Sequence, residues 1–256
     1  MLSRVRASSK SGAVQPVLLL PAHSVTKVAL RTVSEALVSA ATSLLQIEPG
    51  ELMAEFRPAL TPEGIQGNEA QIFIYDTLPG GAGFAQDAAS LGIRLFDAAL
   101  KLMEGCPEKC DGSCYACLRT FRNRLDHGLI DRHVGASLLR YVIHGTSSYS
   151  AERLQSSEHL LYSSLLLSSI PDTSIRREAT MQLAQGGEMS VPIVLFKNDG
   201  KKLCIFLSDP LAESIPASFD ALPDLADSSL IIVNELIVRK NLATAIDQVV
   251  DALNRL

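Results

Sequence analysis

The most informative stretch of the chain is Cys106-Pro-Glu-Lys-Cys110-Asp-Gly-Ser-Cys114-Tyr-Ala-Cys117. Its four cysteines have the spacing C-x3-C-x3-C-x2-C, which lets all four sulfurs converge on one ion without help from distant parts of the chain. A zinc ion held by four thiolates at about 2.3 Å satisfies this spacing in a closed tetrahedron. We therefore predict a Zn²⁺ site at these four residues. An iron–sulfur cluster of the [4Fe–4S] type, which is also held by four thiolates, is the alternative.

The role of a metal in such a site is structural and not catalytic. A metal held by four thiolates has no open coordination position, so it cannot activate water. The fifth cysteine, Cys204, lies far from the others in an apolar run. Because Pro16 and Pro21 cut the apolar run near the N-terminus to less than the length of a signal-peptide core, we expect a cytoplasmic protein. In such a reducing compartment, clustered cysteines serve as metal ligands more often than as disulfides.

Composition narrows the class of protein. The chain has 256 residues, 47% of them hydrophobic and 20% charged, with a formal net charge of −5. This composition excludes a disordered chain, and the negative charge excludes the strong positive field that drives non-specific nucleic-acid binding. The longest apolar stretches, residues 17–20 and the serine-interrupted 160–170, are far below the roughly 20 residues that cross a bilayer. We therefore expect no transmembrane helix and no membrane partner.

Charge also divides the chain. Residues 1–145 hold 14 basic and 14 acidic residues, whereas residues 146–256 hold 9 and 14, so the acidity belongs to the second part. Between them lies Gly145-Thr-Ser-Ser-Tyr-Ser150, a polar stretch that is typical of a linker. We predict a mixed α/β (α+β) protein with a zinc-binding domain over residues 1–145 and a small acidic α/β domain over residues 146–256.

Hydrophobic periodicity predicts the elements of the first domain. A short strand at residues 17–20 precedes a long helix that Ser24 caps and Pro49-Gly50 terminates. Residues 71–75 are rich in β-forming side chains, and the glycine-rich residues 79–83 after them can only form a loop. The other predicted elements are helices over residues 84–103 and 133–143, the latter with Leu138, Leu139 and Val142 on its apolar side.

In the second domain, turn signals separate short apolar runs. The predicted strands at residues 191–196 and 203–207 flank Asn198-Asp-Gly200, a strong hairpin signal. The other predicted elements are helices at residues 157–168, 175–184 and 242–253 and a strand at 230–233. This order is loosely that of a restriction-endonuclease-like domain.

Several spaced motifs agree, in order, with one known family. They are Val33-Ser-Glu-Ala-Leu37, Ile47-Glu-Pro-Gly-Glu-Leu52, Ile72-Phe-Ile-Tyr-Asp-Thr-Leu-Pro-Gly-Gly-Ala-Gly-Phe84, the four cysteines, Cys117-Leu-Arg-Thr-Phe-Arg-Asn123, His127 and Leu129-Ile-Asp-Arg132. Over about residues 17–145, the chain resembles the MrfA-associated zinc-binding (MZB) domain. That family occurs at the C-terminus of DEAD/DEAH-box DNA helicases and in the DrmB-type subunits of the DISARM antiphage system.

The resemblance implies that Cys106, Cys110, Cys114 and Cys117 are the metal ligands. It also implies a DEAD/DEAH-box helicase protein or domain as partner, in a complex for antiphage defence or DNA repair. The chain itself has no G-x-x-x-x-G-K-[ST] motif and cannot be a P-loop ATPase. It departs from the family pattern, which has a tyrosine and an Asn-Gln pair after Cys-Leu-Arg, in having Phe121 and Asn123-Arg124.

The loop glycines Gly80, Gly81 and Gly83 follow a predicted strand. In one interpretation, their backbone N–H groups face a phosphate at a helix N-terminus. In the other, they let the loop pack tightly against the cysteine loop, by which we mean residues 106–117. Asp76, just before them, is a candidate cap or turn acceptor.

A local excess of arginine follows the cysteines and is the one plausible DNA-contacting patch. Its members are Arg119, Arg122, Arg124 and Arg132, with Arg140, His127 and His133 nearby. The competing interpretation is structural: Arg119 neutralises the thiolates, Asp131 and Arg132 form a helix entry and salt bridges, and His127 is a packing residue. We expect any DNA binding by this chain alone to be weak.

The second domain raises an alternative function, that of a metal-dependent DNA nuclease. Its candidate residues, Glu178, Asp199, Lys201 and Asp209, do not form the Asp then Glu-x-Lys pattern of such enzymes. A non-catalytic domain that binds a protein partner, with residues 160–170 as apolar surface, fits the acidity better. A third interpretation is a purely structural subunit of a defence complex.

Overall fold

The structure is a computed structural model, and it describes residues 3–5, 23–58, 70–145, 148–182, 187–211 and 228–256. The chain separates into two compact units, Met1–Ser148 and Tyr149–Leu256. The sequence predicted a division after residue 145. Each unit combines helices with one sheet, so the predicted mixed α/β class is confirmed. The strand predicted at residues 17–20 lies outside the described residues.

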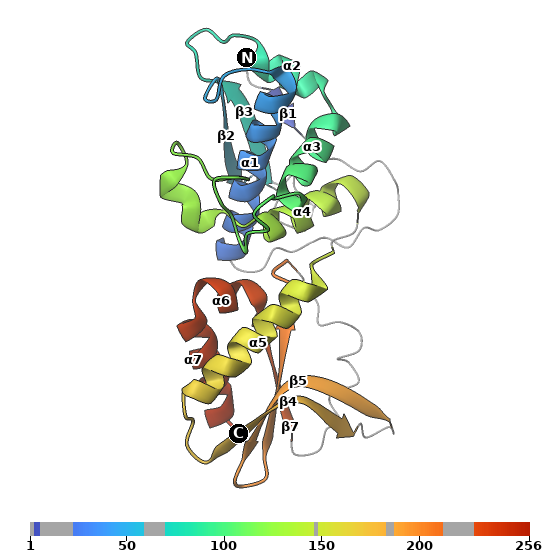
Figure 1. Ribbon diagram of the computed structural model, residues 1–256, viewed down its shortest axis with the longest axis vertical. Helices are drawn as coiled ribbons and strands as arrows, with labels where there is room; N and C mark the ends of the chain where they lie inside the picture. Colours follow the sequence, from blue (N-terminus) through green and yellow to red (C-terminus); the bar gives the residue numbers. More distant parts are fainter. Residues whose placement is uncertain (1–2, 6–22, 59–69, 146–147, 183–186, 212–227) are drawn as a thin grey trace, which may run out of the picture. The chain divides into compact units, whose positions relative to one another are not determined.

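The first unit packs helix α1 (His23–Leu45) against a small sheet and two further helices (Figure 1). The sheet has the order β1 (Ser3–Val5), β3 (Ala70–Asp76), β2 (Leu52–Pro58), with antiparallel neighbours throughout. The helices are α3 (Ile93–Glu104) and α4 (Arg132–His144). The sequence predicted β3 but neither β1 nor β2.

Helix α1 is central because its apolar residues recur at helical spacing. Its buried apolar residues are Val25, Val28, Ala29, Val33, Ala36, Leu37, Ala40 and Ala41. By length and composition, Val25–Leu45 is the one described helix that could cross a membrane, but half of its most apolar window is buried within the protein. The sequence predicted a long helix here but no segment of membrane-spanning length, because Thr32 and Ser34 interrupt its apolar run. Ser24 lies inside this helix, so the predicted N-cap is wrong.

Residues 84–103, predicted as one helix, form two. Helix α2 (Phe84–Ser90) is separated from α3 by a break at Gly92, whose φ of 54° is a conformation that glycine adopts without steric cost. Helix α4 agrees with the prediction in position. However, Val142 is 37% exposed and does not share the buried side of that helix.

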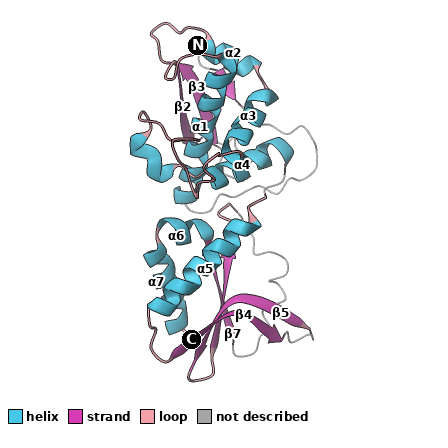
Figure 2. Ribbon diagram, viewed as in Figure 1, coloured by secondary structure: helices cyan, strands magenta, loops and turns pink. Residues whose placement is uncertain are grey.

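The second unit is a four-stranded sheet with helices against one face (Figure 2). The strand order is β4 (Thr173–Gln182), β5 (Glu188–Lys197), β6 (Lys202–Ser208), β7 (Ser228–Asn234). Neighbours are antiparallel except for the parallel pair β6 and β7. The helices are α5 (Ala151–Leu167), α6 (Glu235–Lys240) and α7 (Leu242–Asn254). Alternate strand residues such as Ile193, Leu195, Leu203 and Ile205 form the core with these helices.

The helix predicted at residues 175–184 is wrong, because this segment is strand β4. Its odd-numbered residues from Thr173 to Met181 are the more buried ones and its even-numbered residues are exposed, which is the two-residue period of a strand. The predicted hairpin is confirmed: β5 and β6 pair across Asn198-Asp-Gly200, and Gly200 has a φ of 90°. Helix α6 was not predicted.

Candidate metal centre and its surroundings

The cysteine loop connects the end of α3 to the segment that precedes α4. Helix α3 ends at Glu104, and Cys106 follows directly. After Cys117 the chain forms a short 3-10 helix, η1 (Arg124–Leu129), and then enters α4 at its N-cap, Asp131. Cys106 is buried, and the other three cysteines are half-buried. The site is therefore shielded from solvent on the side of Cys106 and reachable on the other.

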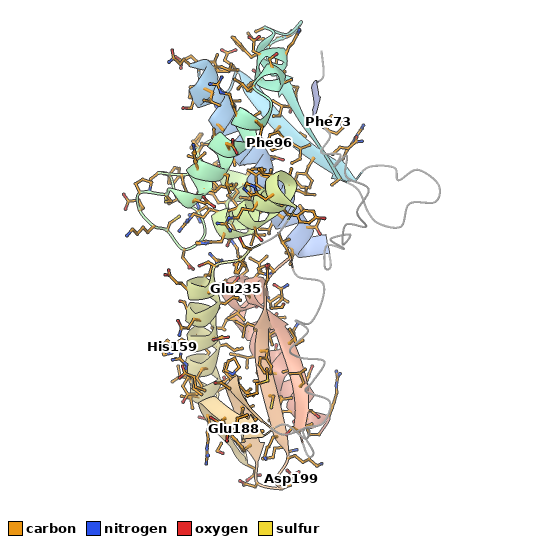
Figure 3. The ribbon with its side chains drawn as sticks, turned by 90° about the vertical axis from the view of Figure 1, so that its right-hand side faces the viewer. Phe73, Phe96, His159, Glu188, Asp199 and Glu235 are labelled. Carbon is orange, nitrogen blue, oxygen red and sulfur yellow. The ribbon has the colours of Figure 1, made fainter. Side chains whose placement is uncertain are left out.

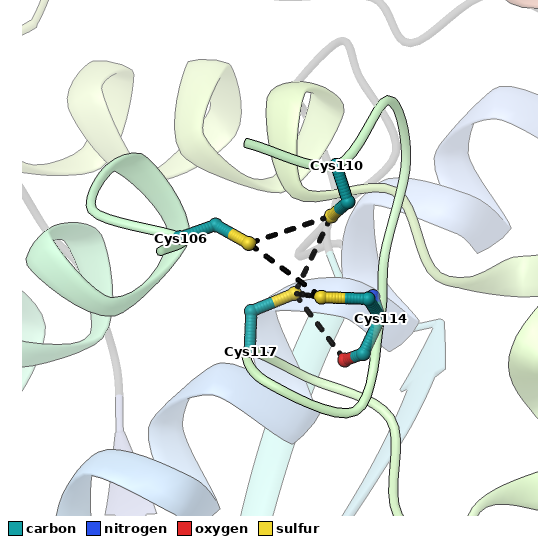
Figure 4. A group of neighbouring side chains, drawn as sticks. All are labelled: Cys106, Cys110, Cys114 and Cys117. Carbon is teal, nitrogen blue, oxygen red and sulfur yellow. Dashed lines mark hydrogen bonds between the residues drawn. The ribbon is translucent and has the colours of Figure 1, made fainter. Parts of the chain in front are cut away.

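The four sulfurs stand at the corners expected for one ion (Figure 4). Four of the Sγ–Sγ distances are 3.6, 3.6, 3.7 and 3.7 Å, and all ligand atoms lie within 4.8 Å of one another. A regular tetrahedron with a sulfur at about 2.3 Å from its centre has edges of about 3.8 Å. Among the described residues, this is the one group of cysteine, histidine or acidic side chains that could hold a metal.

Local backbone turns create this arrangement. The backbone N–H groups of Cys117, Leu118 and Arg119 all donate to the carbonyl oxygen of Cys114, at 2.9 to 3.1 Å. The N–H of Cys114 in turn points at the sulfur of Cys117, at 3.2 Å. Such N–H donors stabilise thiolates and orient them toward a shared ion. The C-x2-C half of the motif is thus folded by its own hydrogen bonds.

The thiols need a cation to ionise together. Burial raises the pKa of Cys106, but hydrogen bonds from the backbone of Cys110 and from the neighbouring thiols outweigh it and lower that pKa to about 7. Burial and the neighbouring thiols raise the pKa of Cys110, and burial raises that of Cys117. Because metal ligands must be deprotonated, a positive ion among these sulfurs would offset this cost. The donor set therefore fits a bound metal ion.

Two of the predicted DNA-contacting arginines form hydrogen bonds within the protein that support the metal site. Arg132 donates from Nε to the carbonyl oxygen of Cys110 at 2.8 Å, and from Nη1 to that of Met103 at 3.0 Å. Arg119 donates from Nε to the hydroxyl of Ser113 at 2.9 Å. Both side chains are half-buried. These contacts are structural, but their partners differ from those that the competing interpretation of the sequence named. Arg119 binds a hydroxyl group and not the thiolates, and Arg132 binds carbonyl groups and not a carboxylate.

The segment after the cysteine loop is tied to α1. The amide of Asn123, which is 5% exposed, donates to Glu35 at 2.7 Å and to the Leu118 carbonyl oxygen at 2.9 Å. Arg31 of α1 forms ion pairs with Glu35 at 2.9 Å and with Asp126 at 2.8 Å. This buried network fixes the orientation of η1. It joins residues about 90 positions apart, which sequence spacing alone gave no way to detect.

Arg122 and Arg124 are exposed, unlike the two arginines above. The guanidinium of Arg122 lies over Gly50, where an added Cβ would come within 2.3 Å of it. The guanidinium of Arg124 lies 4.4 Å from the ring centre of Phe121. Of the four predicted arginines, these two are the ones that present their side chains to solvent.

The glycine loop does neither of the things predicted for it. Nothing lies within 4 Å of a Cβ placed on Gly80 or Gly83, so the loop does not pack tightly. It precedes α2, and α3 separates it from the cysteine loop (Figure 1). The Asp76 carboxylate accepts from the N–H groups of Phe84 and Ala85, so it occupies the helix N-terminus that a phosphate would need. The positive φ of all three glycines shows that they serve the turn itself.

The nuclease candidates of the second unit do not converge. Asp199 lies in the turn before β6, and Asp209 follows the end of that strand, so the seven residues of β6, about 23 Å of strand, separate them. Figure 3 shows Asp199 at one end of this unit and Glu235, the neighbour that helps to raise the pKa of Asp209, at the other. Glu178 lies on strand β4, and Lys201 lies in the same turn as Asp199. The four residues form no common site.

A buried network around Glu235 was missed from the sequence. Its carboxylate, 0% exposed, accepts from Arg153 Nε at 3.0 Å, from Ser157 Oγ at 2.6 Å and from Tyr149 Oη at 2.6 Å. Arg239 lies 3.4 Å from the same carboxylate. The network joins the start of α5 to α6. The sequence signal that could have revealed this network is the position of Glu235, a charged residue between the apolar runs of β7 and α6.

Comparison with known proteins finds a family match over the segment that contains the metal centre. Residues 33–118 match the family model of the MrfA Zn-binding domain. A 120-residue region, 46% of the chain, is 43% identical to Druantia protein DruE from Escherichia coli (strain UMEA 4076-1). The aligned region spans 6% of that protein's length.

A solved structure, that of the DUF1998 helicase MrfA bound to DNA, covers 52% of this chain and 15% of its own, at 18% identity and a TM-score of 0.34. The assignment rests on the family match, which confirms the resemblance seen in the sequence motifs and includes all four cysteines. Residues 33–118 of this chain, with the four cysteines, are therefore similar to the MrfA Zn-binding domain.

Proposed function

We propose that this chain is a non-catalytic, zinc-stabilised module of a DNA helicase system that helps the system to engage DNA and to assemble. The observation that carries the proposal is the tetrahedral group of four cysteine sulfurs inside the segment that matches the MrfA Zn-binding domain. The family resemblance supports a role in antiphage defence or DNA repair in the cytoplasm. The similarity to Druantia protein DruE, of whose length the aligned region spans 6%, supports a role as one module of a larger defence protein or system.

The proposed metal is Zn²⁺, bound by Cys106, Cys110, Cys114 and Cys117. The Sγ–Sγ distances of 3.6 to 3.7 Å support a single ion. In a [4Fe–4S] cluster each cysteine binds a different iron, so the sulfurs would stand farther apart. Elemental analysis of freshly purified protein tests this proposal. One zinc per chain is the expected result, and iron with visible absorbance contradicts it.

The proposed DNA contacts are made by Arg122 and Arg124, the exposed arginines beside the metal centre. Each phosphate contact on duplex DNA contributes roughly 0.9 to the slope of log K against log salt concentration. Replacing both arginines with glutamine is therefore expected to reduce the slope by about 1.8. Arg94→Gln and Arg255→Gln, at arginines outside this segment, provide the matched control. An unchanged slope in the double variant contradicts the proposed contacts.

The proposed partner is a DEAD/DEAH-box helicase protein or domain, bound through the second unit. In α5, Leu161 and Leu165 are buried in the unit's own core, whereas Leu166 and Leu167 are 48% and 85% exposed. Their exchange for aspartate tests this surface in a pull-down with the helicase. The proposal is supported if the variant with aspartate at Leu166 and Leu167 loses the helicase and the control variant Leu78→Asp, changed at an exposed position of the first unit, still binds it. Retention by both variants contradicts it.

A further inference from the structure

Three large apolar side chains are exposed beside the metal centre. Tyr115 is 69% exposed, Phe121 is 74% exposed and Leu125 is 88% exposed. All three come from a short segment that the metal site and the Asn123 network hold in place. Exposing such side chains on a fixed surface costs solvation free energy, and a cluster of them marks an interaction site.

The Arg124 guanidinium packs against the Phe121 ring. Its guanidinium lies 4.4 Å from the ring centre, and its Nη1 donates to the carbonyl oxygen of Phe121 at 3.4 Å. The ring nevertheless keeps most of its surface in solvent. A planar ligand group can therefore stack on the ring while the cation lies against it.

Tyr115 is held by a chain of contacts that leads to the same turn. Its ring stands edge-on to the His127 ring, with the ring centres 5.5 Å apart. His127 Nε2 lies 3.0 Å from two acceptors, the Thr120 carbonyl oxygen and Asn123 Oδ1, so this nitrogen carries the hydrogen. Asn123 Oδ1 also accepts from the N–H of Thr120, beside Phe121. The Tyr115 ring is thus held, through His127, beside the hydrogen-bonded turn that carries Phe121.

We propose that Phe121 and Tyr115 form a base-stacking platform for single-stranded DNA, with Arg122 and Arg124 contacting the adjoining phosphates. The inference rests on the proposed DNA-engaging function and names its ligand. Aromatic rings next to arginines are the combination that binds unpaired bases and their backbone. In a duplex the faces of the bases are already stacked on each other, so they are not available to these rings.

The absence of tryptophan from the chain provides a direct test. In the zinc-loaded 256-residue chain, Phe121→Trp places a single tryptophan at the platform. We expect an oligomer of thymidylate to quench its fluorescence, because a stacked base quenches indole, and a duplex of equal length to quench it much less. Leu78→Trp, at an exposed position of the same unit, is the control and is expected to show no quenching.

Affinity measurements complete the test. Phe121→Ala is expected to weaken single-strand binding by roughly 5- to 150-fold, the range found for one stacked base, and to leave duplex binding and zinc content unchanged. Phe121→Tyr keeps a ring and is expected to bind like the parent. Arg124→Gln is expected to weaken single-strand binding, whereas Arg57→Gln, which removes the equivalent cation from Phe73, is not.

The outcomes separate this inference from the function on which it rests. If neither single-stranded nor duplex DNA binds, both are wrong. If duplex binds in an arginine-dependent way and Phe121→Ala changes nothing, the stacking inference is overturned and the DNA-engaging function stands. If Phe121→Ala loses a helicase partner and keeps single-strand binding, the surface is a protein interface and the inference is again overturned.

Discussion

Between Cys106 and Asp131, the buried aliphatic side chains are only Leu118 and Ile130, among residues that the structure describes completely. In the second unit, strands β5 and β6 alone bury Ile193, Leu195, Leu203 and Ile205 against helices. The first region therefore depends on sulfur ligands and on hydrogen bonds to backbone carbonyls, and the second on apolar burial. The difference shows why four cysteines can fold a segment that has almost no core of its own.

Removal of a metal ligand is expected to have the largest effect, and it tests directly whether the two regions are stabilised in different ways. Cys114→Ser is expected to abolish zinc binding, which contributes about 10–16 kcal/mol in small zinc-dependent folds. Hydrogen exchange should then accelerate over residues 106–131, and the protein should lose solubility. The amides of β5 and β6 should keep their protection. Cys204→Ala, at the cysteine outside the site, should retain one zinc per chain. Equal loss of protection in both units would contradict the separation.

The second unit has its own weak point, the buried carboxylate of Glu235. Glu235→Gln removes the carboxylate that pairs with Arg153, whose side chain is 4% exposed. Breaking a buried ion pair by removing one member costs about 3–5 kcal/mol. We expect denaturant unfolding monitored by hydrogen exchange to show this loss in α5 and α6 and none in the cysteine loop.

An exposed ion pair is the matched control for Glu235. Arg140 and Glu104 are paired at 2.6 Å with side chains 28% and 41% exposed. Glu104→Gln should change stability by no more than about 1 kcal/mol, because solvent screens such pairs. A loss as large as that of Glu235→Gln would show that burial does not determine the cost.

Close packing of α1 with α4 provides a smaller effect. A Cβ on Gly135 would lie 2.5 Å from Thr32 Cγ2 and 2.8 Å from Met103 Sδ. Gly135→Ala should therefore destabilise the first unit by about 1–3 kcal/mol, as overpacking does. Gly128→Ala, where nothing lies within 4 Å, is the control and should change the free energy of unfolding by less than about 0.5 kcal/mol. Thermal unfolding of zinc-loaded protein measures both.

The smallest expected effect concerns pH. Burial raises the pKa of the Asp209 carboxyl, and the negative charge of Glu235 raises it further. The hydrogen bond from the N–H of Leu211 lowers this pKa but does not cancel the rise. Because the folded pKa exceeds the unfolded one, the second unit loses stability as pH rises between these two values, and the loss persists above them. Asp209→Asn should thus stabilise the second unit at neutral pH and flatten its pH dependence. Asp199→Asn, in the exposed turn, should do neither. A stabilisation that is equal at pH 3 and pH 7 would contradict this cause.

Local chemistry was predictable from the sequence, and long-range contacts were not. The cysteine spacing and the Asn198-Asp-Gly200 turn act within a few residues, so both were recognised. The pairing of Asn123 with Glu35 and of Arg153 with Glu235 joins residues more than 80 positions apart. Nothing in their local sequence distinguishes them from solvent-exposed polar residues.

Errors in predicted secondary structure have a similar origin. Strand β4 contains Arg176, Arg177 and Glu178, which favour helix, and its true alternation becomes clear only when β5 lies beside it. The hydrogen bonds of Arg132 could not be predicted for the same reason, since its partners are backbone carbonyl groups that carry no sequence signature.

The parallel pairing of β6 with β7 has a consequence for the order of synthesis and folding. Strands β4 to β6 are neighbours along the chain, whereas residues 209–227 must be made before β7 appears. Pairings between distant segments form later because closing a longer loop costs more entropy. On the ribosome, Leu203 and Ile205 can therefore pack early against Leu161 and Leu165 of α5, but their contacts with β7 and α7 form only after residues 209–227 have been made. We expect this interval to be the one in which the nascent chain most needs a chaperone.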